Sequence, residues 1–226
     1  LVALFNGVGG AAAAIVAAME LTGTLDAGGA RIPALAAHGG DWFAYGSGGA
    51  ASFPADSSTY IAAAAGAFTV LVGGVSFAGS CVTFAKLQEL MTTRPVVFPG
   101  GPVLFAGTVL AGIGLAVGSV VDARDSLVSV WVLVLLGLVA LVAGVLFVLP
   151  VGGADVPIVI SLLNAFTGLT VAASGYVLDN VLLLVAGTLV GASGTILTRL
   201  MAAAMGRSTA NILFGAFKGG STAGST

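Results

Sequence analysis

Residues 127–149 read LVSVWVLVLLGLVALVAGVLFVL, a run of mainly Val, Leu and Ala without a charged side chain. An α-helix needs about 20 apolar residues to cross the hydrocarbon core of a bilayer, and this run meets that length. Charged residues fall almost entirely outside this run and five other apolar stretches, which are residues 1–21, 59–85, 102–121, 157–178 and 181–205. A membrane β-barrel would instead show many stretches of about ten residues with alternating polarity. The sequence therefore predicts an all-α fold, a polytopic membrane helix bundle with six transmembrane helices.

The composition excludes an ordinary soluble domain. Hydrophobic residues make up 58% of the chain, charged residues make up 7%, and the mean hydropathy is +1.14. A polar surface of normal extent cannot be built from these residues. The few basic residues are scattered, so nothing supports a nucleic-acid partner. Because Cys81 is the single cysteine, the chain can form neither an intrachain disulfide nor a thiolate metal cluster, and we expect Cys81 to be a packed small side chain.

Two segments outside the predicted helices have a distinct composition. Residues 22–58 are rich in Gly, Ala and Ser, which predicts an irregular extracytoplasmic loop, and the histidine in it, His38, is expected to be solvated. Residues 206–226 end in a run of Gly, Ser, Thr and Ala that is typical of a flexible linker. We therefore expect the chain to be a piece of a larger polypeptide, with residues 206–226 as a cytoplasmic linker to a further domain.

The basic residues predict the orientation in the membrane. Six spans place both ends of the chain on one side, and that side has five of the seven basic residues, namely Lys86, Arg94, Arg199, Arg207 and Lys218. The opposite side has Arg31 and Arg124. By the positive-inside rule, both ends of the chain are expected in the cytoplasm.

Small and polar residues predict which helix faces meet other helices. Helices associate in lipid through Gly, Ala, Ser and Thr, which let backbones approach closely. In the stretch 59–85 such residues recur at steps of three and four, on one helical face: Gly66, Thr69, Gly73, Ser76, Ser80 and Thr83. Three more stretches share the pattern and are expected to join this helix in an inner group: 1–21, 157–178 and 181–205. The helices at 102–121 and 127–149 are expected to flank that group, the latter against lipid.

Three polar side chains on these faces lie inside predicted spans, Asn6, Ser80 and Asn164. They are functional candidates, because an intramembrane polar group is costly unless it is paired or hydrated. Such residues also commonly serve only to bond neighbouring helices, and the pattern alone leaves both interpretations open. No Asp, Glu, Lys, Arg or His occurs in the central part of any predicted span.

Five segments together resemble the membrane domain of the β subunit of proton-translocating NAD(P) transhydrogenase. They are LVALFNGVGG at 1–10, FAGSCVTFAKL at 77–87, GGADVPIVISLL at 152–163, GTLVGASGTILTRL at 187–200 and MAAAMGRSTAN at 201–211. These segments follow the family's order over nearly the whole chain. The resemblance implies an enzyme that transfers hydride between NAD(H) and NADP(H) in soluble domains and couples this reaction to proton passage through the membrane domain.

The resemblance also implies roles for individual residues. Asn6 occupies a position where some members have a histidine in the proton path, and Ser80 and Asn164 match polar positions of the family's channel. Because Asn does not titrate, the proton carrier is expected to be water or a residue of a partner helix. Asp155 and Arg207 match charged positions at the cytoplasmic face that are thought to communicate with the NADP(H)-binding domain. The close-packed segment of the last helix is matched by Gly191, Ser193 and Gly194.

The partners that the resemblance implies are the α subunit with its membrane helices, the NADP(H)-binding domain and surrounding lipid. The resemblance also implies that the assembled enzyme is a dimer of α and β units in the inner membrane of a bacterium. We expect no hydride-transfer site, no metal and no bound NAD(H) or NADP(H) in this chain itself, because it shows no unit of strand, glycine turn and helix. The alternative is a stand-alone secondary transporter or channel subunit, although no convincing internal repeat supports it. A purely structural membrane anchor would not need polar stripes on four helices.

Overall fold

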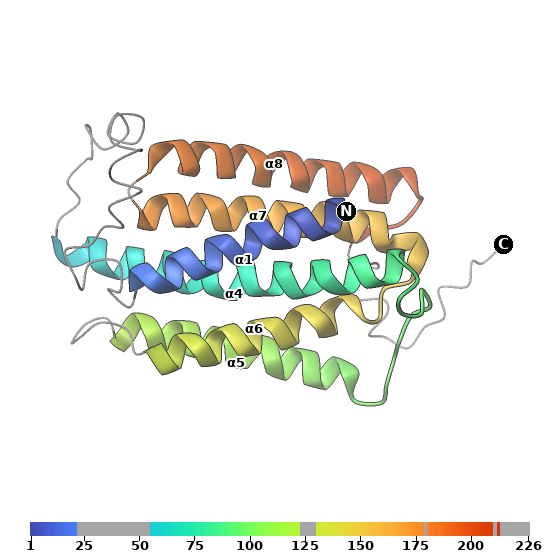
Figure 1. Cartoon of the computed structure of the whole chain (residues 1–226), viewed down its shortest axis with the longest axis horizontal. Helices are drawn as coiled ribbons and strands as arrows, with labels where there is room; N and C mark the ends of the chain where they lie inside the picture. Colours follow the sequence, from blue (N-terminus) through green and yellow to red (C-terminus); the bar gives the residue numbers. More distant parts are fainter. Residues whose placement is uncertain (22–54, 123–129, 179, 210–211, 213–226) are drawn as a thin grey trace.

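The computed structural model describes residues 1–21, 55–122, 130–178, 180–209 and 212, which fold as a bundle of long helices (Figure 1). The long helices, labelled as in Figure 1, are α1 (Val2–Leu21), α4 (Ala55–Leu87), α5 (Gly101–Asp122), α6 (Val130–Val148), α7 (Val156–Val177) and α8 (Val181–Ala204). A short 3-10 helix, η1 (Gly153–Asp155), precedes α7. All 6 long helices are long and apolar enough to cross a membrane, and the described residues include no strand. The predicted all-α bundle with six transmembrane helices is confirmed.

Local sequence signals set several helix ends. Helix α5 begins after Gly100, whose φ of +85° suits a glycine. Asn180 caps the start of α8, because its Oδ1 accepts a hydrogen bond from Leu183 N at 3.1 Å. Gly206, with a φ of +67°, follows the end of the same helix. Most of the predicted loop at 22–58, namely residues 22–54 with His38, lies outside the described residues. Helix α4 begins at Ala55.

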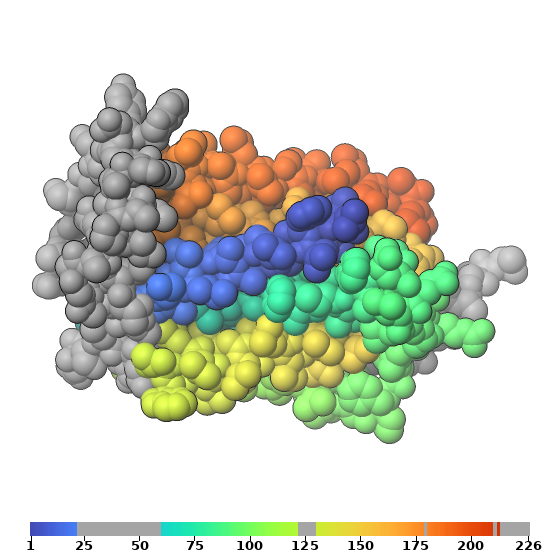
Figure 2. Space-filling view, in the orientation of Figure 1, coloured from blue at the N-terminus to red at the C-terminus, as the bar shows by residue number. Residues whose placement is uncertain are grey.

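Helix α4 occupies the middle of the bundle, in contact with α1, α5, α6 and α7. Figure 1 shows α7 and α8 on one side of α4, and α6 with α5 on the other. In the space-filling view of Figure 2, α1 lies across the face turned to the viewer. All the residues predicted to share the packing face of α4 are buried, namely Gly66, Thr69, Gly73, Ser76, Ser80 and Thr83.

Glycines allow α1 and α4 to approach closely. A Cβ added at Gly73 would lie 2.6 Å from Gly10 O, and one added at Gly7 would lie 2.9 Å from the Cβ of Ser80. Any larger residue at these positions would push the helices apart. The small-residue faces predicted for these two helices therefore meet each other, as close packing in lipid requires.

The order of the helices differs from the prediction in one place. Helix α8 packs mainly against α7 and lies at an edge of the bundle rather than inside it (Figure 1). The physical reason is that a stripe of small residues marks a contact and not a central position. The stripe of α8 serves one neighbour. Helix α6 packs closely on α4 at Ala140 and Gly144. Its Leu135 and Leu138 side chains are exposed, as predicted for a flanking helix that faces lipid. Helix α5 lies at the periphery, as predicted.

Candidate functional site

Three membrane-spanning helices meet at Asn6 of α1. Its Nδ2 donates a hydrogen bond to Ser80 Oγ of α4 at 3.1 Å. On the other side, Thr167 Oγ1 of α7 donates to the backbone oxygen of Asn6 at 3.3 Å. Ser80 is fully buried, and Asn6 is 9% exposed. The structure therefore brings together two of the three polar residues singled out from the sequence.

A second pair of hydroxyl groups extends this site along α4 by about one helical turn. Ser76 Oγ lies 2.7 Å from Thr167 Oγ1, and it also lies 3.0 Å from Leu163 O, to which it can donate. Both hydroxyl residues are buried. We call Asn6, Ser76, Ser80 and Thr167 the polar cluster. It joins α1, α4 and α7 inside the membrane-spanning part of the bundle.

Two hydroxyl groups of the polar cluster, those of Ser76 and Thr167, make more contacts than they have protons. The hydroxyl protons of Ser76 and Thr167 serve three contacts, one to Leu163 O, one to Asn6 O and one between the two hydroxyls. Because a hydroxyl has a single proton, one of these contacts lacks a proton at any moment. Asn6 Oδ1 is also buried, and no described residue donates a hydrogen bond to it. The cluster can therefore change its hydrogen-bond pattern, and it can accept a further donor such as water.

Asn164, the third polar residue, lies outside this cluster. The sequence places it on the inner face of α7 with Ser161 and Gly168, but Asn164 is exposed while those two residues are buried. The helical period explains the difference. Ser161, three residues earlier, faces α8, and Thr167, three residues later, faces α1 and α4. Asn164 lies between these directions, so its expected place on the inner face is wrong for this chain, while its role in a proton path stays a prediction.

Helices α7 and α8 pack through glycines. A Cβ added at Gly168 would collide with the backbone nitrogen of Gly191, and one added at Gly194 would lie 3.0 Å from the backbone of α7. Ser193 does not share this contact, because it is exposed and its Oγ donates to Val190 O of its own helix at 3.1 Å. Within the segment expected to pack closely, two glycines therefore face α7 and the serine points elsewhere.

An ion pair lies at one end of the bundle. Arg207 follows α8, and its Nη1 lies 2.6 Å from Oδ2 of Asp155, the residue that precedes α7. The side chain of Asp155 is 12% exposed and that of Arg207 is 32% exposed. Asp155 Oδ1 is buried without a hydrogen-bond partner in the described part of the chain, so the carboxylate can accept one more donor. The two charged residues matched to the family's cytoplasmic face are therefore in direct contact.

Lys86 has a structural role that the sequence analysis misses, because the charge pattern uses it only as a marker of orientation. It is fully buried in the last turn of α4. Its Nζ donates to Val148 O, Leu149 O and Val151 O at 3.1, 2.6 and 2.7 Å. A usable signal is present, since Lys86 follows buried Thr83 by three residues and so continues the packing face of α4.

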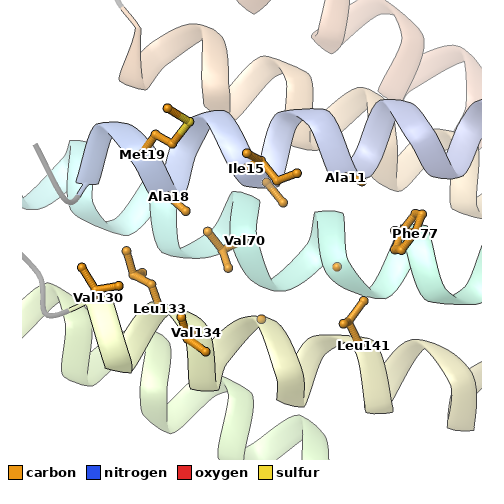
Figure 3. Close-up of a pocket in the computed structure, with 13 residues that line it drawn as sticks. Ala11, Ile15, Ala18, Met19, Val70, Phe77, Val130, Leu133, Val134 and Leu141 are labelled. Carbon is orange, nitrogen blue, oxygen red and sulfur yellow. The ribbon is translucent and has the colours of Figure 1, made fainter. Parts of the chain in front are cut away.

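An apolar groove of about 480 Å³ opens between α1 and α6 over α4 (Figure 3). Ile15 and Met19 of α1 lie along one wall, and Leu133 and Val134 of α6 lie along the other. All of its lining residues are apolar or glycine, so the groove is chemically distinct from the polar cluster. Nor do the described residues include a group of three or more His, Cys, Asp or Glu that could hold a metal ion.

Comparison with known proteins gives a family model and similar sequences. A family model described as NAD(P) transhydrogenase beta subunit matches residues 1–226. Two sequences named NAD(P) transhydrogenase subunit beta, both from Rhodospirillum rubrum and one of them from a specified strain, are each 38% identical to the chain over 146 residues. The match covers 65% of this chain and 30% of each relative, so it spans less than a third of the length of these curated relatives. The chain belongs to the NAD(P) transhydrogenase beta subunit family.

Proposed function

We propose that the chain is the proton-translocating membrane part of NAD(P) transhydrogenase. In this proposal, proton passage is coupled to hydride transfer between NAD(H) and NADP(H) in soluble domains. The observation that carries it is the polar cluster, which is buried where three membrane-spanning helices meet. Buried polar groups at membrane depth are costly, which makes this cluster a candidate for a transport path. Membership of the transhydrogenase beta subunit family favours the proton as the species transported.

Water and hydroxyl groups carry the proton in this proposal. None of the four side chains of the polar cluster ionises near neutral pH. Asn6 Oδ1 has no donor among the residues that the structure describes, so it is the acceptor at which we place a water molecule. The protons of Ser76 and Thr167 have alternative acceptors. They can therefore reverse the direction of the hydrogen-bond chain after a proton has passed.

Coupling is proposed to act through the ion pair of Asp155 and Arg207, which joins the start of α7 to the segment after α8. The family resemblance places that segment beside the NADP(H)-binding domain, with residues 206–226 as the linker. Helix α7 also carries Thr167 of the polar cluster. A movement of the soluble domain that loosens the ion pair can therefore bias the cluster, and by reciprocity the cluster can bias the domain.

We also propose that another membrane helix covers the exposed strip at Asn164. Exposed hydroxyl residues of α8 satisfy themselves within their own helix, as Thr188 Oγ1 does by donating to Leu184 O at 2.7 Å. A carboxamide has two donor hydrogens and an acceptor oxygen, and contact with lipid would leave these groups unsatisfied. The membrane helices of the α subunit are the proposed cover.

The proposed assembly is a dimer of α and β units in the inner membrane of a bacterium. The two ends of this chain are then on the cytoplasmic side, as the distribution of basic residues predicts.

Replacing Asn6 by Leu tests the proposed function. In the full-length beta subunit, assembled with its partner subunit in vesicles, Asn6→Leu removes the amide and fills its space with apolar atoms. We expect proton movement coupled to hydride transfer between NADPH and NAD⁺ to fall about tenfold or more, the effect of losing one hydrogen bond to a buried partner. Val8→Leu, at an exposed position of the same helix, is the matched control and should retain the parental rate. A parental rate in Asn6→Leu would contradict the proposal.

A further inference from the structure

Lys86 is a buried basic residue whose described partners are all backbone oxygens. It lies in the last turn of α4 with no exposed surface. Its Nζ is 3.1 Å from Val148 O, 2.6 Å from Leu149 O and 2.7 Å from Val151 O. These oxygens come from the last residue of α6 and from the residues that follow it. The contact therefore joins the end of one helix to the end of another.

The chemistry of these three acceptors fits an ammonium group. An ammonium has three N–H donors, so each of the three carbonyl oxygens receives one. The oxygens also lie at a helix C-terminus, where the helix dipole favours a positive charge. A neutral amine has two N–H donors, so one of the three hydrogen bonds from Lys86 Nζ would be lost. The geometry thus favours a structural clamp over a proton-carrying group.

The backbone segment that Lys86 binds continues along the chain to Asp155, one partner of the ion pair. We call residues 149–155, which join α6 to α7, the connector. The connector is also bonded to the segment after α4 at two points, because Val96 N donates to Leu149 O at 3.1 Å and Gly153 N donates to Thr93 O at 2.9 Å. Its last residue is Asp155, four residues after the carbonyl of Val151 that Lys86 binds. The position of the Asp155 carboxylate therefore depends on how the connector is held.

We propose that Lys86 is a positioning residue for the Asp155–Arg207 ion pair. Lys86 holds the connector and so fixes the position of Asp155 relative to Arg207. It also links this ion pair to α4, the helix that carries Ser80. Ser80 and Lys86 are six residues apart, or about 9 Å along the helix. Helix α4 thereby links the polar cluster to the ion pair through contacts within this chain, the kind of physical link that energetic coupling between two sites can use. This inference rests on the proposed function.

A double-mutant cycle in the full-length beta subunit, assembled with its partner subunit and reconstituted in vesicles, tests the inference. Lys86→Met removes the charge and the donors while keeping most of the side-chain volume, and Asp155→Asn removes the ion pair. We expect each single variant to lower coupled proton movement about tenfold, and the double variant to be less than about twofold slower than either, because both changes act on one element. Hydride exchange confined to the soluble domains should stay within about twofold of the parental rate, because neither change touches a nucleotide site.

The opposite outcomes would overturn the inference. If the two effects multiply, or if Lys86→Met lowers the Tm and both activities in parallel, Lys86 is only a structural cap. Thr83→Val is the matched control, because Thr83 is equally buried on α4 and donates to Gly79 O of its own helix at 2.8 Å. It should couple at the parental rate. If Lys86→Met does not assemble, Lys86→Gln carries the same cycle, since it keeps two N–H donors without the charge.

The proposed function and this inference fail in different ways. A parental enzyme that moves no protons in the vesicles defeats the proposed function. A parental enzyme that moves protons, beside a Lys86→Met variant that moves them equally fast, defeats the inference alone.

Discussion

Gly168 of α7 and Gly191 of α8 are in backbone contact, so close that a Cβ added at Gly168 would collide with the backbone nitrogen of Gly191. The same two helices touch at a further point, where a Cβ added at Gly187 would collide with Ala172 N. Lipid gives little hydrophobic drive for helix association, so the contact depends on this close approach. Because Gly168 has no side chain, α7 and α8 can approach closely enough for α8 to pack on the bundle.

Replacing Gly168 by Ala should destabilise the purified protein in detergent. The added methyl group has no space, and overpacking of this kind costs about 1–3 kcal/mol. Gly114→Ala on α5 is the matched control, because a Cβ there meets nothing within 4 Å. Thermal unfolding followed by circular dichroism should show a lower Tm for Gly168→Ala and a Tm at or above the parental value for Gly114→Ala. Equal shifts in both variants would mean that α7 and α8 are not in backbone contact.

Cysteine variants labelled by a lipid-soluble reagent should show which faces of the bundle are open. Leu138 and Val134 of α6 are 55% and 46% exposed, so cysteines there should react strongly. Ser76 and Gly73 of α4 are buried, so cysteines there should react weakly. The labelling is measured by mass spectrometry on membranes, with the Cys81→Ser protein as background. Strong reaction at position 76 together with weak reaction at position 138 would contradict the arrangement of α4 and α6.

The helices and their contact faces can be predicted from sequence because each signal is local. Apolar length determines a span, and small residues at steps of three and four determine a face. The buried stripe of α4 from Gly66 to Thr83 follows from these two rules. The position of a helix in the bundle depends on which other helices pack against it. A stripe of small residues shows that a contact exists but does not identify the partner helix. For this reason α8 is placed wrongly from sequence alone.

The polar cluster could be predicted in part for the same reason. Asn6 and Ser80 follow from small-residue stripes, but Thr167 does not, because membrane helices contain many hydroxyl residues that bond only their own helix. Thr167 is distinguished by its distance to Ser76, a contact 91 residues apart in sequence. Lys86 is missed because a basic residue at a helix end usually reaches water. Its burial depends on the end of α6, which lies 62 residues further along the chain.

Asn164→Leu should abolish coupled proton movement in the assembled enzyme. The amide is exposed on α7 between the directions of α1 and α8, so in the membrane it needs water or a partner side chain to satisfy it. Leucine fills the space but offers neither donor nor acceptor. We expect proton uptake by reconstituted vesicles and the coupled hydride transfer to fall by more than about tenfold, the scale of one lost buried hydrogen bond. Exchange confined to the soluble domains should continue.

Two further variants separate the amide's chemistry from packing at the same strip. Asn164→Gln keeps the carboxamide and should retain part of the coupled activity, whereas Leu169→Val, at an exposed apolar position of the same helix, should behave like the parent. Asn164 tests the exposed strip of α7 better than Asn6 does, because Asn164 lies outside the polar cluster in the described chain. Any effect of its replacement must therefore arise from water or from a partner helix. If Asn164→Leu moves protons at the parental rate, the amide serves only to pack α7 against a neighbouring helix.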